Sequence, residues 1–241
     1  MSPKSAIVLG AALLLSSLTA TFLLTNTWES VSAASQNIQV TGSARRVLTS
    51  DFGVLRASIQ AENPRQLDAY RQLQEARPVL EAFLEEQGIA KDSVRFFPST
   101  GFPLYNFGLN GEQLGLRAFQ YQLRFEISSA DVKAIEKLAA SLSSLIERGV
   151  SSQIESVEYY YTGLAELKIE IQAEAAKDAQ ERASRIAEAT GRKLGPLTSA
   201  RMGVLQITPR YSNVISDYGM NDASSIEKEI TAVVSSTFAL E

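Results

Sequence analysis

The sequence contains no cysteine and no histidine among its 241 residues, and these two absences exclude several classes of enzyme. Without cysteine, the chain has no disulfide bond, no thiol nucleophile and no cysteine-bound zinc or iron–sulfur site. Without histidine, it has no Ser–His–Asp triad and no imidazole that binds a metal or carries a proton. We therefore expect a protein that uses neither a cofactor nor a metal ion.

Positive charge is also scarce relative to negative charge. The formal net charge is -4 and the sequence pI is about 5.2, which argues against a surface that binds phosphates, so we expect no nucleic-acid partner. Hydrophobic residues make up 45% of the chain and charged residues 21%, as in ordinary globular proteins. A chain of this length and composition buries a core, and we expect one large domain with an appendage.

The appendage is the N-terminal segment, residues 1–33, which has the pattern of an export segment. Lys4 precedes a long apolar run, and the small residues Val31-Ser32-Ala33 resemble a signal-peptidase site. The run from Ala6 to Thr25 also approaches the roughly 20 residues that a membrane-spanning helix needs. A cleaved signal peptide and an uncleaved inner-membrane anchor at residues 6–25 therefore both remain open. Either one places the body, residues 34–241, in the periplasm or elsewhere outside the cytoplasm.

The body alternates predicted strands with predicted helices. Apolar residues repeat every second position in the strands and every three or four positions in the helices. Strands are expected at residues 38–41, 54–59, 94–97, 119–127, 154–161, 164–171, 200–207 and 231–240, and helices between Pro64 and Gly88, Val132 and Gly149, and Ala173 and Gly191. Three strand–helix–strand passages predict an α+β fold, a layered sandwich in which helices cover a sheet.

Three local features refine this prediction. Pro78 lies inside the first helical pattern and should kink or interrupt that helix. The third helix carries a stripe of small residues that should let it lie close to the sheet, namely Ala173, Ala176, Ala179, Ala183, Ile186 and Ala187. Gly191 and a turn at Gly195-Pro196 should end that helix.

The third helix also carries the best match to a known family. The matching residues are Ala173, Ala176, Asp178, Ala179, Arg182, Ala183, Ile186, Ala187, Gly191, Leu194 and Gly195, supported by Val40-x-Gly42, the strand 118–127 and the closing strand 233–240. Over residues 36–241 the chain resembles the SIMPL-domain family. That family includes exported bacterial proteins described as periplasmic, immunogenic or related to oxidative stress. The resemblance implies no catalytic residues, and because some relatives look like large ring- or channel-like assemblies, we expect a homo-oligomer.

The stretch between two predicted strands, Pro98–Leu116, is the candidate interaction surface. It gathers apolar side chains among glycine and asparagine, above all Phe102, Leu104, Tyr105, Phe107 and Leu109. Clustered exposed apolar residues mark interfaces or membrane contacts. Two alternatives stay open: the stretch is an interface with another copy or partner, or it forms a hairpin or folds back to cap the core, which buries its aromatic rings. Contact with a membrane surface is a third possibility.

Candidate catalytic groups are few. Glu155 and Glu158 could form a glycosidase pair, but residues three apart on a regular strand point to opposite faces. The acidic loop around Asp217 and Asp222 does not have the spacing of an EF-hand, and no S-x-x-K sequence supports a Ser–Lys pair. We therefore expect a membrane-tethered, non-enzymatic protein that works by self-assembly or partner binding in the cell envelope, with a possible stress link taken from the family. The alternatives are an envelope hydrolase that uses carboxylates or a Ser–Lys pair, and a carrier of a small ligand or peptide.

Overall fold

The computed structural model describes residues 16, 19–21 and 36–241. Apart from those four N-terminal positions, which are helical, the predicted export segment lies outside the described residues. In the part of the chain that is described, no helix is both long and apolar enough to span a bilayer.

The described body is an α+β protein, as the sequence predicts. Its strands are β1 (Asn37–Thr49), β2 (Phe52–Asn63), β3 (Val94–Phe96), β4 (Thr100–Phe107), β5 (Gln113–Ser129), β6 (Ser151–Tyr160), β7 (Leu194–Met202), β8 (Gln206–Pro209), β9 (Met220–Asn221) and β10 (Glu227–Leu240). Its helices are α2 (Gln66–Glu86), α3 (Val132–Ser141) and α4 (Leu164–Ala189), with the 3-10 helices η1 (Lys91–Ser93) and η2 (Leu142–Arg148).

These elements divide into two compact units. The first unit holds residues 36–45, Ile169–Leu205 and Thr231–Glu241, and the second holds Arg46–Lys168 and Gln206–Ile230. Over the described residues, one sheet has the strand order β1-β10-β8-β9, with β7 also paired to β10. The other sheet has the order β3-β5-β2-β6, with β4 also paired to β5.

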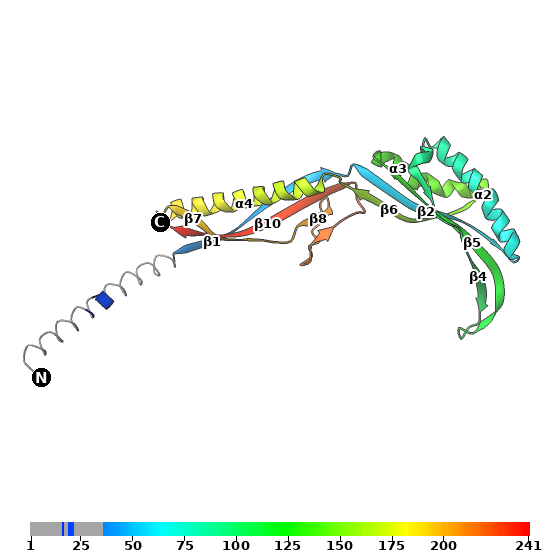
Figure 1. Cartoon of the computed structure of the whole chain (residues 1–241), viewed down its shortest axis with the longest axis horizontal. Coiled ribbons are helices and arrows are strands. Elements are labelled where there is room, and N and C mark those ends of the chain that lie inside the picture. The colour runs from blue at the N-terminus through cyan, green and yellow to red at the C-terminus, as the bar shows by residue number, and fades with distance from the viewer. Residues whose placement is uncertain (1–15, 17–18, 22–35) are drawn as a thin grey trace, which may run out of the picture. The chain divides into compact units, whose positions relative to one another are not determined.

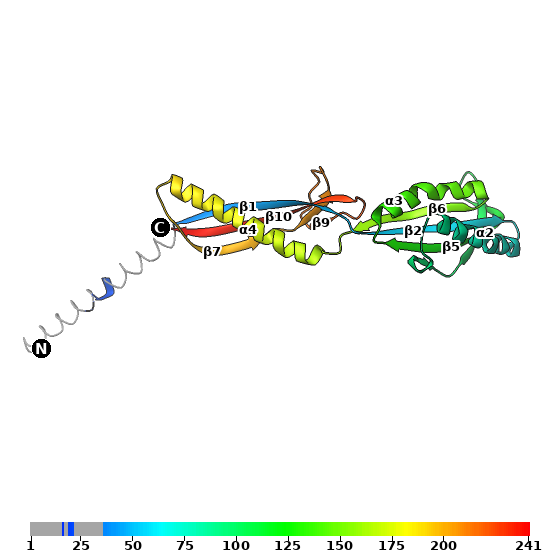
Figure 2. The same cartoon turned by 90° about the horizontal axis from the view of Figure 1, so that it is seen from above.

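In the first unit, α4 lies along β1, β7 and β10 (Figure 2). Every fourth residue of α4 is buried: Leu167, Ile171, Ala175, Ala179, Ala183 and Ala187. The contact is close because Gly42 of β1 has no side chain. A Cβ atom there would lie 2.3 Å from the Ala175 carbonyl oxygen and 2.3 Å from the Ala179 amide nitrogen. Small residues on both elements therefore let the two backbones touch.

In the second unit, α2 and α3 cover one face of the sheet formed by β5, β2 and β6 (Figure 1). The core lies between these layers and includes Leu55, Ile59, Phe83, Phe125 and Ile135, each almost completely buried. Strand β2 is central, because β5 and β6 both pair with it in antiparallel register over most of its length. Its alternate residues therefore decide what each face of the sheet presents.

The alternation in residues 164–171 gives a wrong prediction, because this segment is the first part of α4 and not a strand. Leu167 and Ile171 are buried and lie four residues apart, whereas Ile169 is exposed, so the segment follows the helical period. The Gly195-Pro196 turn is also wrong, since both residues belong to β7. Gly191 does follow the helix end in the left-handed conformation, with φ 71°.

Pro78 does not interrupt the first helix, because α2 continues through it. Pro78 is exposed, while Leu73, Leu80 and Phe83 are buried around it. Burial of these side chains against the sheet outweighs the loss of one backbone hydrogen bond at the solvent-facing proline. Leu67 and Tyr70 also fit the helical spacing of apolar residues in this segment, but both are exposed.

The close packing of α4 on β1 can be tested with Gly42→Ala. The added methyl group overlaps the helix backbone, so the free energy of unfolding should fall by about 2 kcal/mol, as for overpacked cores. Gly203→Ala is the matched control, since the nearest atom to its added Cβ is 3.3 Å away. Urea unfolding should show a much smaller change for the control, and equal effects would contradict the close-approach argument.

Candidate interaction surface

The stretch Pro98–Leu116 forms most of a hairpin made by β4 and the start of β5. Gly101 lies opposite Tyr121 and Leu104 lies opposite Ala118 in this antiparallel pair. The chain reverses between Gly108 and Glu112, where the Gly108 amide donates to the Glu112 carbonyl oxygen at 2.8 Å. The stretch therefore forms a hairpin, but it does not fold back onto the core, and it projects away from α2 and α3 (Figure 1).

The hairpin does not bury its apolar side chains. Of the five residues named from the sequence, Phe102, Tyr105, Phe107 and Leu109 are exposed, and Leu104 is half-buried. Leu114 and Leu116 on the facing strand are exposed too. We call Phe107, Leu109, Leu114 and Leu116 the hairpin tip. Phe107 is 65% exposed, so the tip is an apolar surface held out on two paired strands.

The face of the second unit's sheet that α2 and α3 leave uncovered is polar. Arg56 lies at its centre, where its Nε donates to Glu126 at 2.8 Å and its Nη1 lies 2.8 Å from a Glu158 oxygen. The Tyr160 hydroxyl donates a short hydrogen bond to the other Glu158 oxygen. Gln122 donates to Ser58 at 2.7 Å. The side chains of this face therefore partner one another.

These contacts shift the pKa values of two charged side chains on this face. The hydrogen bond from Tyr160, followed by that from Arg56, lowers the pKa of Glu158 below its ordinary value. The same network raises the pKa of Arg56, chiefly through its hydrogen bond with Glu158. A glycosidase needs one carboxylic acid with a raised pKa as proton donor. Glu158 has the opposite shift, so the arrangement does not favour that chemistry.

The prediction that Glu155 and Glu158 point to opposite faces is wrong, because β6 contains a bulge. Ser156 lies opposite Arg56 and Ile154 lies opposite Ala57, which leaves Glu155 as the extra residue. Glu155 lies 3.2 Å from Arg124 Nε, on the polar face that also holds Glu158. Both carboxylates are therefore on one face, and each has its own arginine.

Lys228 is buried in the second unit, and its role there is structural. Its Nζ donates to the Tyr159 carbonyl oxygen at 2.6 Å and, in a shorter bond, to the Asp222 carbonyl oxygen. Burial lowers the pKa of Lys228, although the charge of Asp222 opposes the shift. Lys228 Nζ thus bonds to two backbone carbonyl groups and not to a serine hydroxyl, so this buried lysine does not form a Ser–Lys pair.

The acidic loop that follows β9 is organised by Asp222. Its carboxylate accepts hydrogen bonds from the backbone amide of Ser224 at 2.9 Å and from the amide of Ser225 at 3.2 Å, as well as from both hydroxyl groups. Burial raises the pKa of Asp222, whereas these hydrogen bonds and the Lys228 charge lower it. Their combined effect is larger than that of burial, so the pKa lies below its ordinary value. Within the described residues, no cluster of acidic side chains has an arrangement that could hold a metal ion.

A second apolar surface lies on the connection between β8 and β9, residues 210–219, which we call the β8–β9 loop. Tyr211, Val214, Ile215 and Tyr218 are exposed there, and Tyr218 is 96% exposed. Sequence reasoning missed this surface because it considered only the acidic residues of the region. Tyrosine and β-branched residues among serine, asparagine and glycine were the available sign.

An open hollow of about 520 Å³ adjoins the β8–β9 loop. It is lined by Val157 and Glu158 of β6, by Pro209, Ser212 and Val214, and by residues 220–224. A smaller cavity of about 160 Å³ lies beside α2 and β3, between Leu84, Ile89, Val94 and Phe96. That cavity is smaller than the roughly 300–1,000 Å³ of usual ligand pockets, so it gives little support to a small-ligand carrier.

Comparison with known families assigns the chain. The model of the family SIMPL, described as a protein of unknown function (DUF541), matches residues 38–238. The chain therefore belongs to the SIMPL family, as the resemblance of its motifs predicts. A search of curated proteins found no match to the chain.

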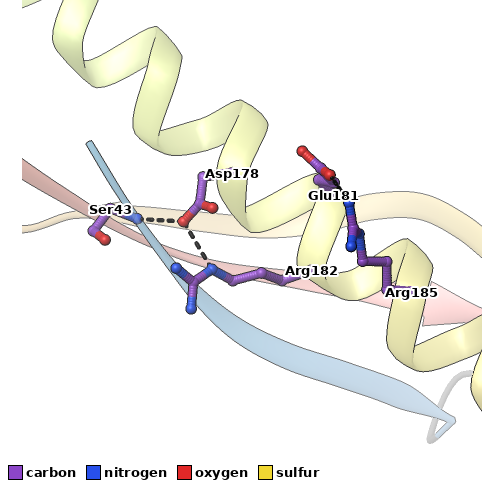
Figure 3. Close-up of polar contacts among 5 residues, drawn as sticks. All are labelled: Ser43, Asp178, Glu181, Arg182 and Arg185. Atoms are coloured by element: carbon purple, nitrogen blue, oxygen red, sulfur yellow. Dashed lines mark hydrogen bonds and ion pairs between the residues drawn. The ribbon is translucent and has the colours of Figure 1, made fainter. Parts of the chain in front are cut away.

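The motif residues that carry the resemblance meet in the first unit. Asp178 of α4 accepts a hydrogen bond from the Ser43 backbone amide at 2.8 Å and another from Arg182 Nε at 2.8 Å (Figure 3). Gly42, beside Ser43, touches the backbone of Ala179. The Ser43 amide lowers the pKa of Asp178 more than Arg182 does. These motifs therefore join a helix to a strand.

The stability that Glu158 supplies should depend on pH. Because its folded pKa lies below 4.5, the contribution is present above that pH and is lost as pH falls through the folded pKa. Glu158→Gln should lower the free energy of unfolding by about 1–2 kcal/mol at pH 7, and the difference from wild type should shrink towards pH 3. The matched control is Glu147→Gln at an exposed position, and a gap that does not change with pH would contradict the prediction.

The role of Lys228 can be tested with Lys228→Met. The substitution leaves the Tyr159 and Asp222 carbonyl groups without this donor, so the free energy of unfolding should fall by about 2 kcal/mol. Amide hydrogen exchange over residues 222–226 should also become faster. Lys133→Met, at an exposed lysine of α3, should change neither quantity. Unchanged exchange in Lys228→Met would show that the lysine does not hold this loop.

Proposed function

We propose that this SIMPL-family chain is an exported, membrane-tethered protein that acts by self-assembly in the cell envelope and not by catalysis. The apolar run at residues 6–25 supports the export and the tether. The hairpin tip supports the assembly. A stress-related role would follow from the assembly, since the chain has no cysteine for thiol-based peroxide chemistry.

The observation that carries the proposal is the solvent exposure of an ordered apolar hairpin. Exposing Phe107, Leu109 and their neighbours to water costs free energy that contact with another apolar surface recovers, at roughly 25 cal/mol for each Å² buried. The hairpin is ordered by its strand pairing, so little further entropy is lost on binding. A preformed apolar projection of this kind favours a docking element.

The charged groups of the second unit favour assembly over catalysis. Arg56 forms ion pairs with both Glu126 and Glu158 on the polar face, and Lys228 donates hydrogen bonds to two carbonyl groups. A general acid, general base or nucleophile must instead be free to reach a substrate. At these positions, therefore, each charged group already has a partner within the chain, which does not favour the envelope-hydrolase alternative.

The proposal predicts that the hairpin tip holds an oligomer together. Replacing Phe102–Leu109 by a short Gly/Ser turn should convert a multi-chain particle into single chains. The full chain would be purified in a mild detergent, and its protein mass measured by light scattering coupled to size exclusion. The melting temperature should change little, because the deleted side chains lie outside the core.

Ile146→Ser provides the control for loss of an exposed apolar residue elsewhere in the second unit. This variant should keep the wild-type mass. A wild-type chain that is monomeric, or a truncated chain with the wild-type mass, would overturn self-assembly through the hairpin.

A further inference from the structure

We propose that the hairpin tip of one copy docks into the hollow beside the β8–β9 loop of a second copy. This inference rests on the proposed self-assembly and names both sides of the contact. The hairpin tip is the inserting surface. The accepting surface is the hollow together with the exposed side chains of Tyr211, Ile215 and Tyr218 on the adjoining β8–β9 loop, which we call the rim. The two surfaces differ, so the contact is heterologous, and each copy offers one of each.

The hollow has the lining that an apolar, uncharged occupant requires. Val157, Pro209, Val214 and Met220 supply apolar walls in a space of about 520 Å³. The acidic residues in its lining already have partners within their own copy. Glu158 is bound by Arg56 and Tyr160, and the Asp222 carboxylate is bound by two serines. The carboxylates that line the hollow therefore already accept hydrogen bonds from their own copy.

The hairpin tip matches this requirement. No charged residue occurs between Phe102 and Gly111. The next residue, Glu112, turns its side chain back onto the hairpin, where it accepts a hydrogen bond from the Asn110 amide at 3.1 Å. Phe107 and Leu109 thus lie at the turn of the hairpin, and the nearest charged side chain, Glu112, already accepts a hydrogen bond within the hairpin. A convex apolar end of this kind complements a hollow with apolar walls.

The tip of one copy cannot fill the hollow of the same copy. Within the second unit, β4 lies apart from β8 and the loop that follows it, as Figure 1 shows. The tip is exposed over its whole length, and so is the aromatic rim of the hollow. Both surfaces are therefore free for a partner, and the chain itself supplies the matching one.

Contacts of Arg210 hold Tyr211, the first residue of the rim, in position. Tyr211 is 84% exposed and has φ 66°, a backbone conformation that bulky residues rarely adopt. The guanidinium carbon of Arg210 lies 4.8 Å from the centre of its ring, and Arg210 is tied to Glu227 by an ion pair of 2.8 Å. Tyrosine and methionine are enriched at protein interfaces, and this rim and lining contain Tyr211, Tyr218 and Met220.

The first experiment uses two double variants of the full chain in one mild detergent. The tip variant carries Phe107→Ser and Leu109→Ser, and the rim variant carries Ile215→Ser and Tyr218→Ser. Each should lose self-association at least tenfold in light scattering, since each lacks one side of the contact. Ile146→Ser, with a 64% exposed side chain, is the control that should associate as wild type does.

Mixing the two variants in equal amounts distinguishes this contact from one between two tips. The tip variant keeps an intact hollow and the rim variant keeps an intact tip, so the mixture should form a discrete two-chain particle. If the rim variant assembles like wild type, or the mixture stays single-chain, the docking inference is overturned. Loss of assembly in the tip variant alone would then leave the proposed function standing, whereas a monomeric wild type would overturn both.

A second experiment does not depend on how well the serine variants fold. Because the chain has no cysteine, one cysteine introduced into each copy can form a disulfide bond only between the two chosen positions. Copies with Leu109→Cys mixed with copies with Met220→Cys should form a disulfide-linked dimer on mild oxidation. Copies with Leu109→Cys mixed with copies with Ile146→Cys should not. Equal cross-linking of both mixtures, or cross-linking of neither, would refute the inference.

Discussion

The alternation of strand β2 is the constraint on which the second unit depends. One side of the strand carries Leu55, Ala57 and Ile59, which are fully buried under the helices. The other side carries Arg56, Ser58 and Gln60, which bond to residues of β5 and β6. Because strand side chains alternate strictly, a single strand separates an apolar layer from a polar one. Because β5 and β6 pair with β2, their side chains are divided between the same two faces of the sheet.

That division explains where apolar surface remains exposed. The apolar side chains on one face of the sheet are buried in the core. The charged side chains on the other face pair with one another in the arginine–carboxylate network. Exposed apolar residues of the second unit then concentrate at the hairpin and at the β8–β9 loop, where the chain leaves the regular sheet. The proposed contact joins these two places.

The first unit follows a different rule, which is close approach of backbones. Gly42 and the alanines of α4 bring the helix against the strand, and the Asp178 carboxylate bonds the Ser43 amide beside that contact. The SIMPL motif residues Val40-x-Gly42 and Asp178-Ala179 belong to this joint. Their role is thus to hold a helix to a sheet.

The α+β class, the family and most element positions follow from the sequence, because alternation and helical spacing are local properties. Local patterns gave wrong predictions in two places. In residues 164–171 the apolar residues fit both the strand period and the helix period, and at Glu155 the pairing with the neighbouring strand sets the direction of the side chain. The bulge beside Ala57 sets the direction of Glu155, and no pattern within β6 contains it. The apolar character of Phe102–Leu109 was visible in the sequence, but its exposure was not. Whether a hairpin folds back or projects depends on long-range strand pairing and on which face the helices occupy. Only the tertiary structure, which brings β4, β5 and β2 together, decides that.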